Sequence, residues 1–157
     1  MTQGLIIILW LFICAMQDAR QRQIANRLTL GVALLALIYL LWNGSTWLGA
    51  SVSQGLGAFI LALLFTLPGY ALGRLGAGDV KLLAALGLAT DPLIVLGSLV
   101  GSAGASVLWL IFAPRLWPLM GQGLKERLTH LAPGASTKLP FAPFLLIGFG
   151  CAWFWIH

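Results

Sequence analysis

The sequence predicts an all-α membrane protein, a polytopic bundle of about six transmembrane helices with both termini outside. Hydrophobic residues make up 60% of its 157 residues and charged residues only 8%, whereas an average soluble domain has about 25% charged residues. A transmembrane helix needs about 20 apolar residues, so six of them and their loops account for most of the chain. We therefore expect one membrane-embedded domain over residues 1–157.

Six apolar segments can be marked along the chain. The fourth is the shortest, and its ten residues are also compatible with a re-entrant segment. Extension to the flanking Gly76 and Asp91 gives a span of marginal length. The six segments are Leu5–Met16, Leu28–Trp42, Val52–Leu72, Val80–Ala89, Leu93–Ala113 and Leu139–Ile156.

The distribution of basic residues favours six spans. If all six segments cross the membrane, the first, third and fifth loops carry all nine Lys and Arg residues. The positive-inside rule then places these loops in the cytoplasm and both termini outside. Without the fourth span, the basic fifth loop would lie outside. Membrane topology thus explains the net charge of +5, and we expect the lipid bilayer, not nucleic acid, to be the surrounding partner.

The fifth loop, about residues 115–138, is expected to lie at the cytoplasmic interface. Leu124, Leu128 and Leu131 recur there at the spacing of an amphipathic helix. The two cysteines, Cys14 and Cys151, form no C-x-x-C pair, so we expect no zinc module, no metal and no cofactor. The N-terminal apolar run lacks a basic start and is expected to be a retained helix. Tryptophans near the span ends, Trp10 among them, are interpreted as interfacial anchors.

Two aspartates are candidates for chemistry at the predicted cytoplasmic edge. Asp18 ends the first span there and Asp79 opens the fourth, so both lie at one membrane depth. Two carboxyl groups brought close together share a proton, which is the chemistry of an aspartyl protease. Gly76 and Gly78 would let a substrate strand approach closely. Asp91 lies twelve residues after Asp79, about 18 Å away along a helix, and is not expected to join them.

Simpler roles are open for both aspartates. An Asp after Gly is commonly a helix N-cap, and an Asp before an Arg-rich stretch is commonly a solvated loop residue. Intramembrane carboxylates also relay protons or bind cations, so a small transporter or channel subunit using Asp18 and Asp79 is the alternative function. We find no inverted repeat that would favour it.

Three local sequences resemble motifs of one enzyme family. Asp18–Asn26, which includes Arg20, resembles the D-x-R-x-x-x-I-P-N motif, with Ala25 in the place of its proline. Gly76–Gly87 resembles the family's G-x-G-D motif. Leu139–Leu145, with Pro140 and Pro143, is similar to the P-[FY]-x-P-F box that opens the family's last helix. In this order, the motifs resemble those of prepilin peptidases, members of the GxGD intramembrane aspartyl proteases.

The resemblance implies an aspartic endopeptidase that removes the leader peptide of type IV prepilins at the cytoplasmic face of the bacterial inner membrane. It implies a substrate with a basic leader followed by a hydrophobic helix. The chain resembles short, peptidase-only members of the family, which process Flp-type pilins and lack the N-methyltransferase and zinc region. Flagellin-like archaeal proteins are the alternative class of substrate. A presenilin-like protease ranks last, because the Y-D and P-A-L signatures are absent. The resemblance implies catalysis by Asp18 and Asp79, with Gly76, Gly78, Lys81, Arg20, Asn26, Pro140 and Pro143 as binding or structural residues.

Overall fold

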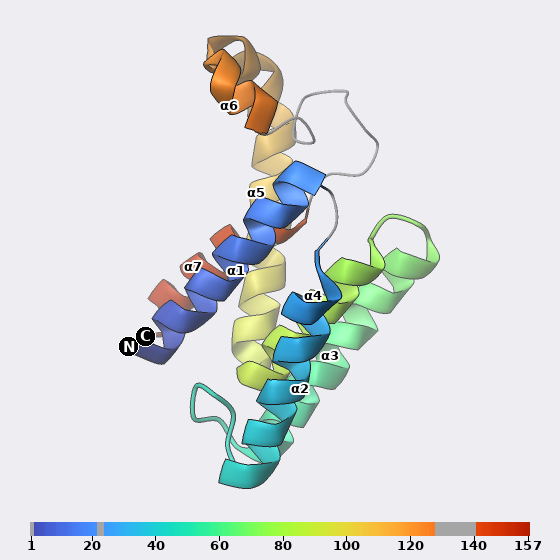
Figure 1. Ribbon diagram of the computed structural model, residues 1–157, viewed down its shortest axis with the longest axis vertical. Helices are drawn as coiled ribbons and strands as arrows, with labels where there is room; N and C mark the ends of the chain where they lie inside the picture. Colours follow the sequence, from blue (N-terminus) through green and yellow to red (C-terminus); the bar gives the residue numbers. More distant parts are fainter. Residues whose placement is uncertain (1, 22–23, 128–140) are drawn as a thin grey trace.

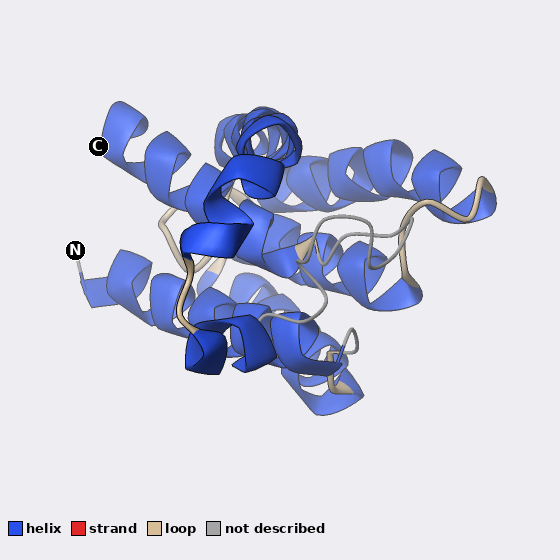
Figure 2. Ribbon diagram, turned by 90° about the horizontal axis from the view of Figure 1, so that it is seen from above, coloured by secondary structure: helices blue, strands red, loops and turns tan. Residues whose placement is uncertain are grey.

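The computed structural model describes residues 2–21, 24–127 and 141–157, and every regular element within these ranges is a helix (Figures 1 and 2). The prediction of an all-helical chain is confirmed for this part of the sequence. In chain order the elements are α1 (Thr2–Gln21), α2 (Asn26–Asn43), α3 (Val52–Ala71), α4 (Ala77–Ala89), α5 (Pro92–Leu116), the 3₁₀ helix η1 (Trp117–Leu119), α6 (Gln122–Arg127) and α7 (Ala142–Ile156).

Local signals in the sequence account for several helix limits. Ser51 and Gln54 form a reciprocal capping box at the start of α3. Gly44 ends α2 in the left-handed conformation, with φ at +69°, which costs a glycine little. Pro92 occupies the first position of α5, where its missing N–H would have no helical partner. The predicted segments at 28–42, 52–72 and 93–113 therefore correspond closely to α2, α3 and α5.

The first helix is longer than the apolar segment that predicted it. α1 continues to Gln21, so Asp18 and Arg20 lie in its last turn and not in a loop. Gln and Arg have good helix propensity, which allows the polar end of the segment to stay helical. The end of α1 therefore holds the side chain of Asp18 on a rigid element.

The helices form two groups that meet at α5. α5 packs most extensively on α7, and α7 also packs on α1; α4 packs on both α2 and α3. Small residues bring α5 and α7 close together, since a Cβ on Gly101 would lie 2.7 Å from the Cα of Gly148. α3 and α4 approach as closely, because a Cβ on Gly87 would lie 2.8 Å from backbone atoms of Ala58. Each group is thus held by tight helix contacts.

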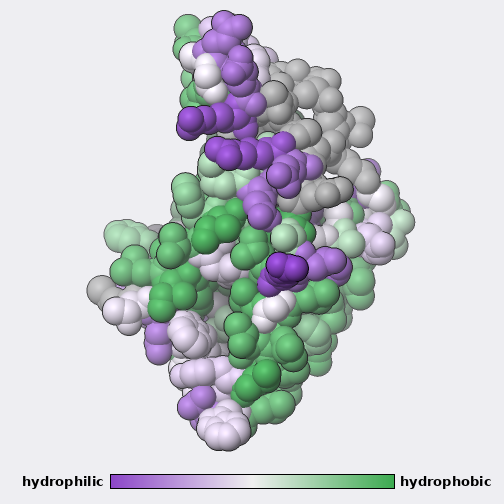
Figure 3. Space-filling view, in the orientation of Figure 1, coloured by the Kyte–Doolittle hydropathy of each residue, from purple (hydrophilic) through white to green (hydrophobic). Residues whose placement is uncertain are grey.

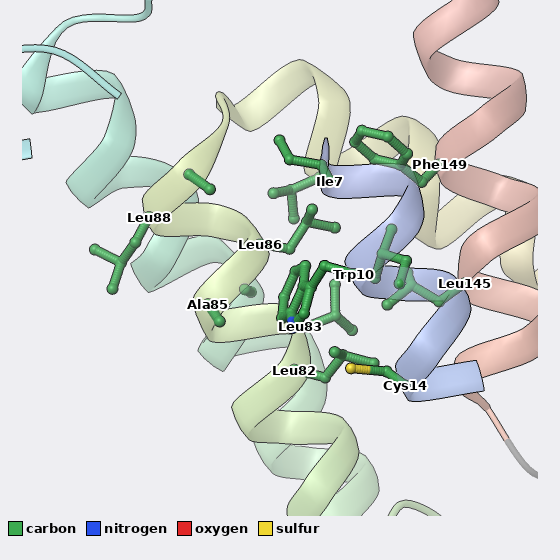
Figure 4. Close-up of a cluster of buried hydrophobic side chains, with 14 of the residues drawn as sticks. Ile7, Trp10, Cys14, Leu82, Leu83, Ala85, Leu86, Leu88, Leu145 and Phe149 are labelled. Carbon is green, nitrogen blue, oxygen red and sulfur yellow. The ribbon is translucent and has the colours of Figure 1, made fainter. Parts of the chain in front are cut away.

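The hydrophobic core lies around α4. Nine of its thirteen residues are buried, namely Val80 and every residue from Leu82 to Ala89. In Figure 4, Trp10 and Cys14 of α1 extend toward α4, and Leu145 and Phe149 of α7 lie on the other side of α1. The interpretation of Trp10 as an interfacial anchor is wrong, because its side chain is 9% exposed and its Nε1 donates to the carbonyl oxygen of Leu28 at 2.8 Å.

Within the described ranges, four helices are long and apolar enough to cross a membrane: α1, α2, α3 and the stretch Pro92–Leu119. With 13 residues, α4 is about 20 Å long at 1.5 Å per residue, shorter than a hydrocarbon core of about 30 Å. Because other helices surround it, this short helix need not reach both lipid surfaces itself. The chain is a membrane protein; the count of six spans and the orientation of the termini stay predictions.

One end of the molecule is markedly hydrophilic. Figure 3 shows hydrophilic side chains gathered at the end that carries α6, while apolar side chains cover much of the middle of the visible face. α6 has six residues and includes the exposed Leu124. It corresponds to the start of the predicted interfacial helix, whose remaining leucines, Leu128 and Leu131, lie outside the described residues.

Candidate active site

A polar cavity of about 630 Å³ lies where the turns α1–α2 and α3–α4 come together. Asp18 and Asp79 both line it, so the structure brings together the two carboxylates that the sequence placed at one membrane depth. The lining residues come from three places: the end of α1, the start of α2 with the residues before it, and the start of α4 with Gly76. They are Gln17, Asp18, Gln21, Ile24, Ala25, Asn26, Gly76, Ala77, Gly78, Asp79 and Lys81.

Asp18 is buried, with 5% of its surface exposed. Its Oδ2 accepts a hydrogen bond of 2.9 Å from the backbone N–H of Ala142, the first residue of α7. An ionisable group can be buried only when such partners replace water, and the first N–H groups of a helix lack partners within the helix. The alternative of a solvated loop residue is therefore wrong for Asp18. The start of the last helix orients this carboxylate.

Asp79 is the third residue of α4 and is half-buried. Its Oδ2 accepts a hydrogen bond of 3.2 Å from the backbone N–H of Gly76, just before the helix. The N-cap of α4 is Gly76, so the alternative that Asp79 is itself the helix N-cap is wrong; Asp79 instead accepts from the N-cap residue out of the third helical position. A carboxylate has two oxygens with about four lone-pair directions, so capping is compatible with a chemical role in the same cavity.

The two glycines of the G-x-G-D motif have ordinary backbone conformations. Gly76 is extended, with φ at −80°, and Gly78 lies within the first turn of α4. The positive-φ glycine of this connection is Gly73, at +70°. A Cβ on Gly78 would lie 3.7 Å from that of Ile24, and a Cβ on Gly76 would lie 3.5 Å from Oδ2 of Asp79. Both are ordinary van der Waals distances, so neither the turn nor the packing requires glycine at these positions.

Hydrogen bonds of polar side chains connect the elements that line the cavity. The Nζ of Lys81 donates to Oδ1 of Asn26 at 3.1 Å, linking α4 to α2. The Oε1 of Gln17 accepts from the backbone N–H of Ala25 at 3.0 Å. Sequence reasoning missed Gln17, Gln21 and Ile24 as lining residues, although the position of Gln17 next to Asp18 was an available signal.

The remaining predicted site residues lie elsewhere. Arg20 is exposed and lines a separate hollow on α1 with Phe12 and Gln21. Pro143 lies in the first turn of α7, next to the N–H that holds Asp18, and does not line the cavity. Pro140 lies outside the described residues. The D-x-R motif therefore contributes Asp18 and Asn26 to this cavity but not Arg20.

Asp91 lies at the opposite end of α4. Its Oδ1 accepts a hydrogen bond of 3.0 Å from the backbone N–H of Ile94 and caps α5. It lines a different cavity, of about 430 Å³, together with Gly49 and Ile156. Among the residues that the structure describes, no group of three or more His, Cys, Asp or Glu side chains is arranged to hold a metal ion.

Comparison with known proteins gives one result. The family model of the type IV leader peptidase family matches residues 5–121 of the chain. The matched region includes Asp18, Asp79 and most of the described bundle, and it ends before α7. No match to the chain was found among curated proteins or among solved structures.

Proposed function

The chain belongs to the type IV leader peptidase family, and we propose that it is an aspartyl endopeptidase that removes the leader peptide of type IV prepilins. The observation that carries this proposal is the meeting of Asp18 and Asp79, from separate helices, in one polar cavity. The proposed location is the cytoplasmic face of the bacterial inner membrane, because the basic residues favour that orientation. Flp-type prepilins are the proposed substrates, following the resemblance to short family members.

The proposed chemistry uses one proton shared by the two carboxyl groups. The ionised carboxylate takes a proton from a water molecule while the water oxygen attacks the carbonyl carbon of the cleaved bond. The protonated partner donates to the carbonyl oxygen as it gains negative charge. As the C–N bond then breaks, the leaving nitrogen takes a proton from the dyad and one hydroxyl of the tetrahedral diol returns its proton to the dyad, so that the carboxylic acid and the amine depart with the dyad back in its starting state.

The contacts around the dyad support this chemistry. The Asp18 carboxylate is held by the N–H of Ala142, so its direction is set before substrate arrives, which lowers the entropic cost of reaching the transition state. Lys81 and Asn26 supply N–H donors at the cavity wall. We assign them to the binding of the substrate backbone next to the cleaved bond.

Glycine at 76 and 78 supports the approach of an extended substrate strand. Both residues line the cavity beside Asp79, and the fold does not need glycine at either position. A side chain here would occupy space between the substrate backbone and the carboxyl group. The proposed reason for these two glycines is therefore substrate access.

Family membership favours hydrolysis over the alternative of a proton or cation relay through Asp18 and Asp79. The two functions also differ in what they need. A relay requires a polar path across the membrane, whereas α4 beyond Lys81 is buried and consists of apolar residues and glycine up to Ala89.

The deciding experiment replaces each aspartate with Asn and measures processing. A type IV prepilin with a basic leader is co-expressed with the wild-type chain, Asp18→Asn, Asp79→Asn or Asp91→Asn, and leader loss is followed by gel shift. We expect both dyad variants to insert normally and to lose activity by a factor of about 10³ or more. Asp91→Asn is the matched control and should process normally. Normal processing by either dyad variant would refute the mechanism.

A further inference from the structure

A second, apolar hollow of about 230 Å³ lies between α1 and α2, and we call it the seam groove. Its floor consists of Ile7, Trp10, Ala36 and Ala89, each at most 9% exposed. Leu35 at its rim is 67% exposed, so the groove opens toward the surroundings of the bundle. The short side chains of Ala36 and Ala89 create its depth, because larger residues there would fill it.

The seam groove and the aspartate cavity are bounded by the same helices. Each of the three helices lines both hollows. Trp10 of α1, Ala36 of α2 and Ala89 at the end of α4 line the groove. Asp18, Asn26 and Asp79 of the same helices line the cavity. Trp10 and Asp18 are eight positions apart, and Asp79 and Ala89 are ten positions apart. The groove is therefore about 12–15 Å from the dyad along the helix axes.

A hydrogen bond joins α1 to α2 between the groove and the aspartate cavity. The Nε1 of Trp10 donates to the carbonyl oxygen of Leu28 at 2.8 Å and joins α1 to α2 between the two hollows. Figure 4 shows Trp10 on the side of α1 that faces α4, close to Leu83. The spacing of α1 and α2 is thus set at the level between the cavity and the groove.

We propose that the seam groove binds the apolar helix of the prepilin substrate, about eight to ten residues beyond the cleaved bond. This inference rests on the proposed function, which puts the cleaved bond at the aspartate cavity and the substrate helix directly after it. From that bond, a helix entering the membrane beside α1 and α2 reaches the depth of Ala36 and Ala89 after about 12–15 Å.

Packing in a membrane explains why a hollow is needed. Lipid tails are as apolar as the substrate helix, so burial of apolar surface alone does not hold two helices together. Close van der Waals contact at small residues does. A large side chain of the substrate fits the depression over Ala36 and Ala89, and this contact sets the depth at which the cleaved bond lies.

The first test fills the groove with Ala36→Phe. Two synthetic substrates share a basic leader and a glycine before the cleaved bond; one continues into a 20-residue Leu/Ala helix and the other stops five residues after the bond. We expect Ala36→Phe to lower kcat/KM for the helical substrate about tenfold, through KM, and to leave the short substrate unchanged. Ala103→Phe, on the exposed side of α5, is the control and should change neither. If Ala36→Phe changed kcat/KM for the helical and the short substrate by the same factor relative to wild type, the proposal would be overturned.

The second test does not depend on catalysis or on a filled groove. A photoreactive benzoylphenylalanine replaces Leu35 or, as a control of similar exposure that points about 100° away around α2 and does not line the groove, Leu34. In the Asp79→Asn background, the helical substrate should crosslink to position 35 and not to 34. Equal crosslinking at both, or only lipid adducts at 35, would overturn the proposal. A wild-type chain that cleaves neither substrate would instead contradict the proposed function.

Discussion

The two ends of α4 carry aspartates that look alike locally and differ in their surroundings. Asp79 accepts a hydrogen bond from the backbone N–H of Gly76 at 3.2 Å, and Asp91 accepts one from that of Ile94 at 3.0 Å. Each carboxylate thus bonds a backbone N–H three residues away at a helix start. Asp79 shares its cavity with Asp18, whereas Asp91 is the sole acidic residue among the described ones that line its cavity. A hydrogen bond to a helix start therefore does not distinguish a candidate catalytic aspartate from a structural one. The presence of a second carboxylate in the same cavity does distinguish them.

The charge around the two ends differs as well. The described Lys and Arg residues lie at the end that holds Asp79: Arg20, Arg27, Arg74, Lys81, Arg115, Lys125 and Arg127. Residues 43–51 and 90–92, at the Asp91 end, contain no basic residue. Arg22 and Lys138 lie outside the described residues. This difference in charge predicts that the two ends lie on opposite sides of the membrane.

The largest expected effect is all-or-none labelling from outside the cell. Cysteines are introduced singly at Gln122, in α6 at the Asp79 end, and at Ser45, at the Asp91 end, in a background with Cys14→Ala and Cys151→Ser. An impermeant maleimide should label position 45 and not 122, because the positive-inside rule keeps the basic end in the cytoplasm. Labelling of both after permeabilisation is the control. The reverse pattern would place the dyad on the outer face.

The next effect concerns the glycine beside Asp79. Gly78→Ala adds a methyl group at ordinary contact distance from Ile24, and alanine favours the first turn of α4. We expect normal accumulation and an equal or higher melting temperature, with leader cleavage at least about tenfold slower because the methyl group displaces the substrate strand.

Gly31→Ala is the matched control for this change. A Cβ on Gly31, in α2, has no atom within 4 Å, and this variant should cleave at the wild-type rate. Full activity of Gly78→Ala would mean that substrate does not approach Asp79 closely on this side.

The smallest effect concerns the cap at Asp91. Asp91→Ala removes the acceptor for the N–H of Ile94 and should lower the free energy of unfolding by about 1 kcal/mol, whereas Asp91→Asn keeps an acceptor and most of the stability. Melting temperatures in detergent measure the difference, and the cleavage rate per folded molecule should be unchanged in both. A large loss of activity in folded Asp91→Asn would remove the contrast between the two ends of α4.

Hydrophobic runs of transmembrane length predicted α2, α3 and α5 because, in a membrane, a helix satisfies its backbone hydrogen bonds internally. The same reasoning could not find that Trp10 is buried or that Gln17 lines the cavity, since both depend on which helices become neighbours.

Apolar length, charge and motif are properties of the chain in order, so they predicted the membrane class, the helical content and Asp18 and Asp79 as candidate residues. The burial of Asp18 against the start of α7, where it accepts from the N–H of Ala142, depends on the folded arrangement, because the two residues are 124 positions apart. The fold likewise shows that neither backbone conformation nor packing requires glycine at position 78. These facts arise from the packing of helices far apart in sequence, which no local pattern encodes.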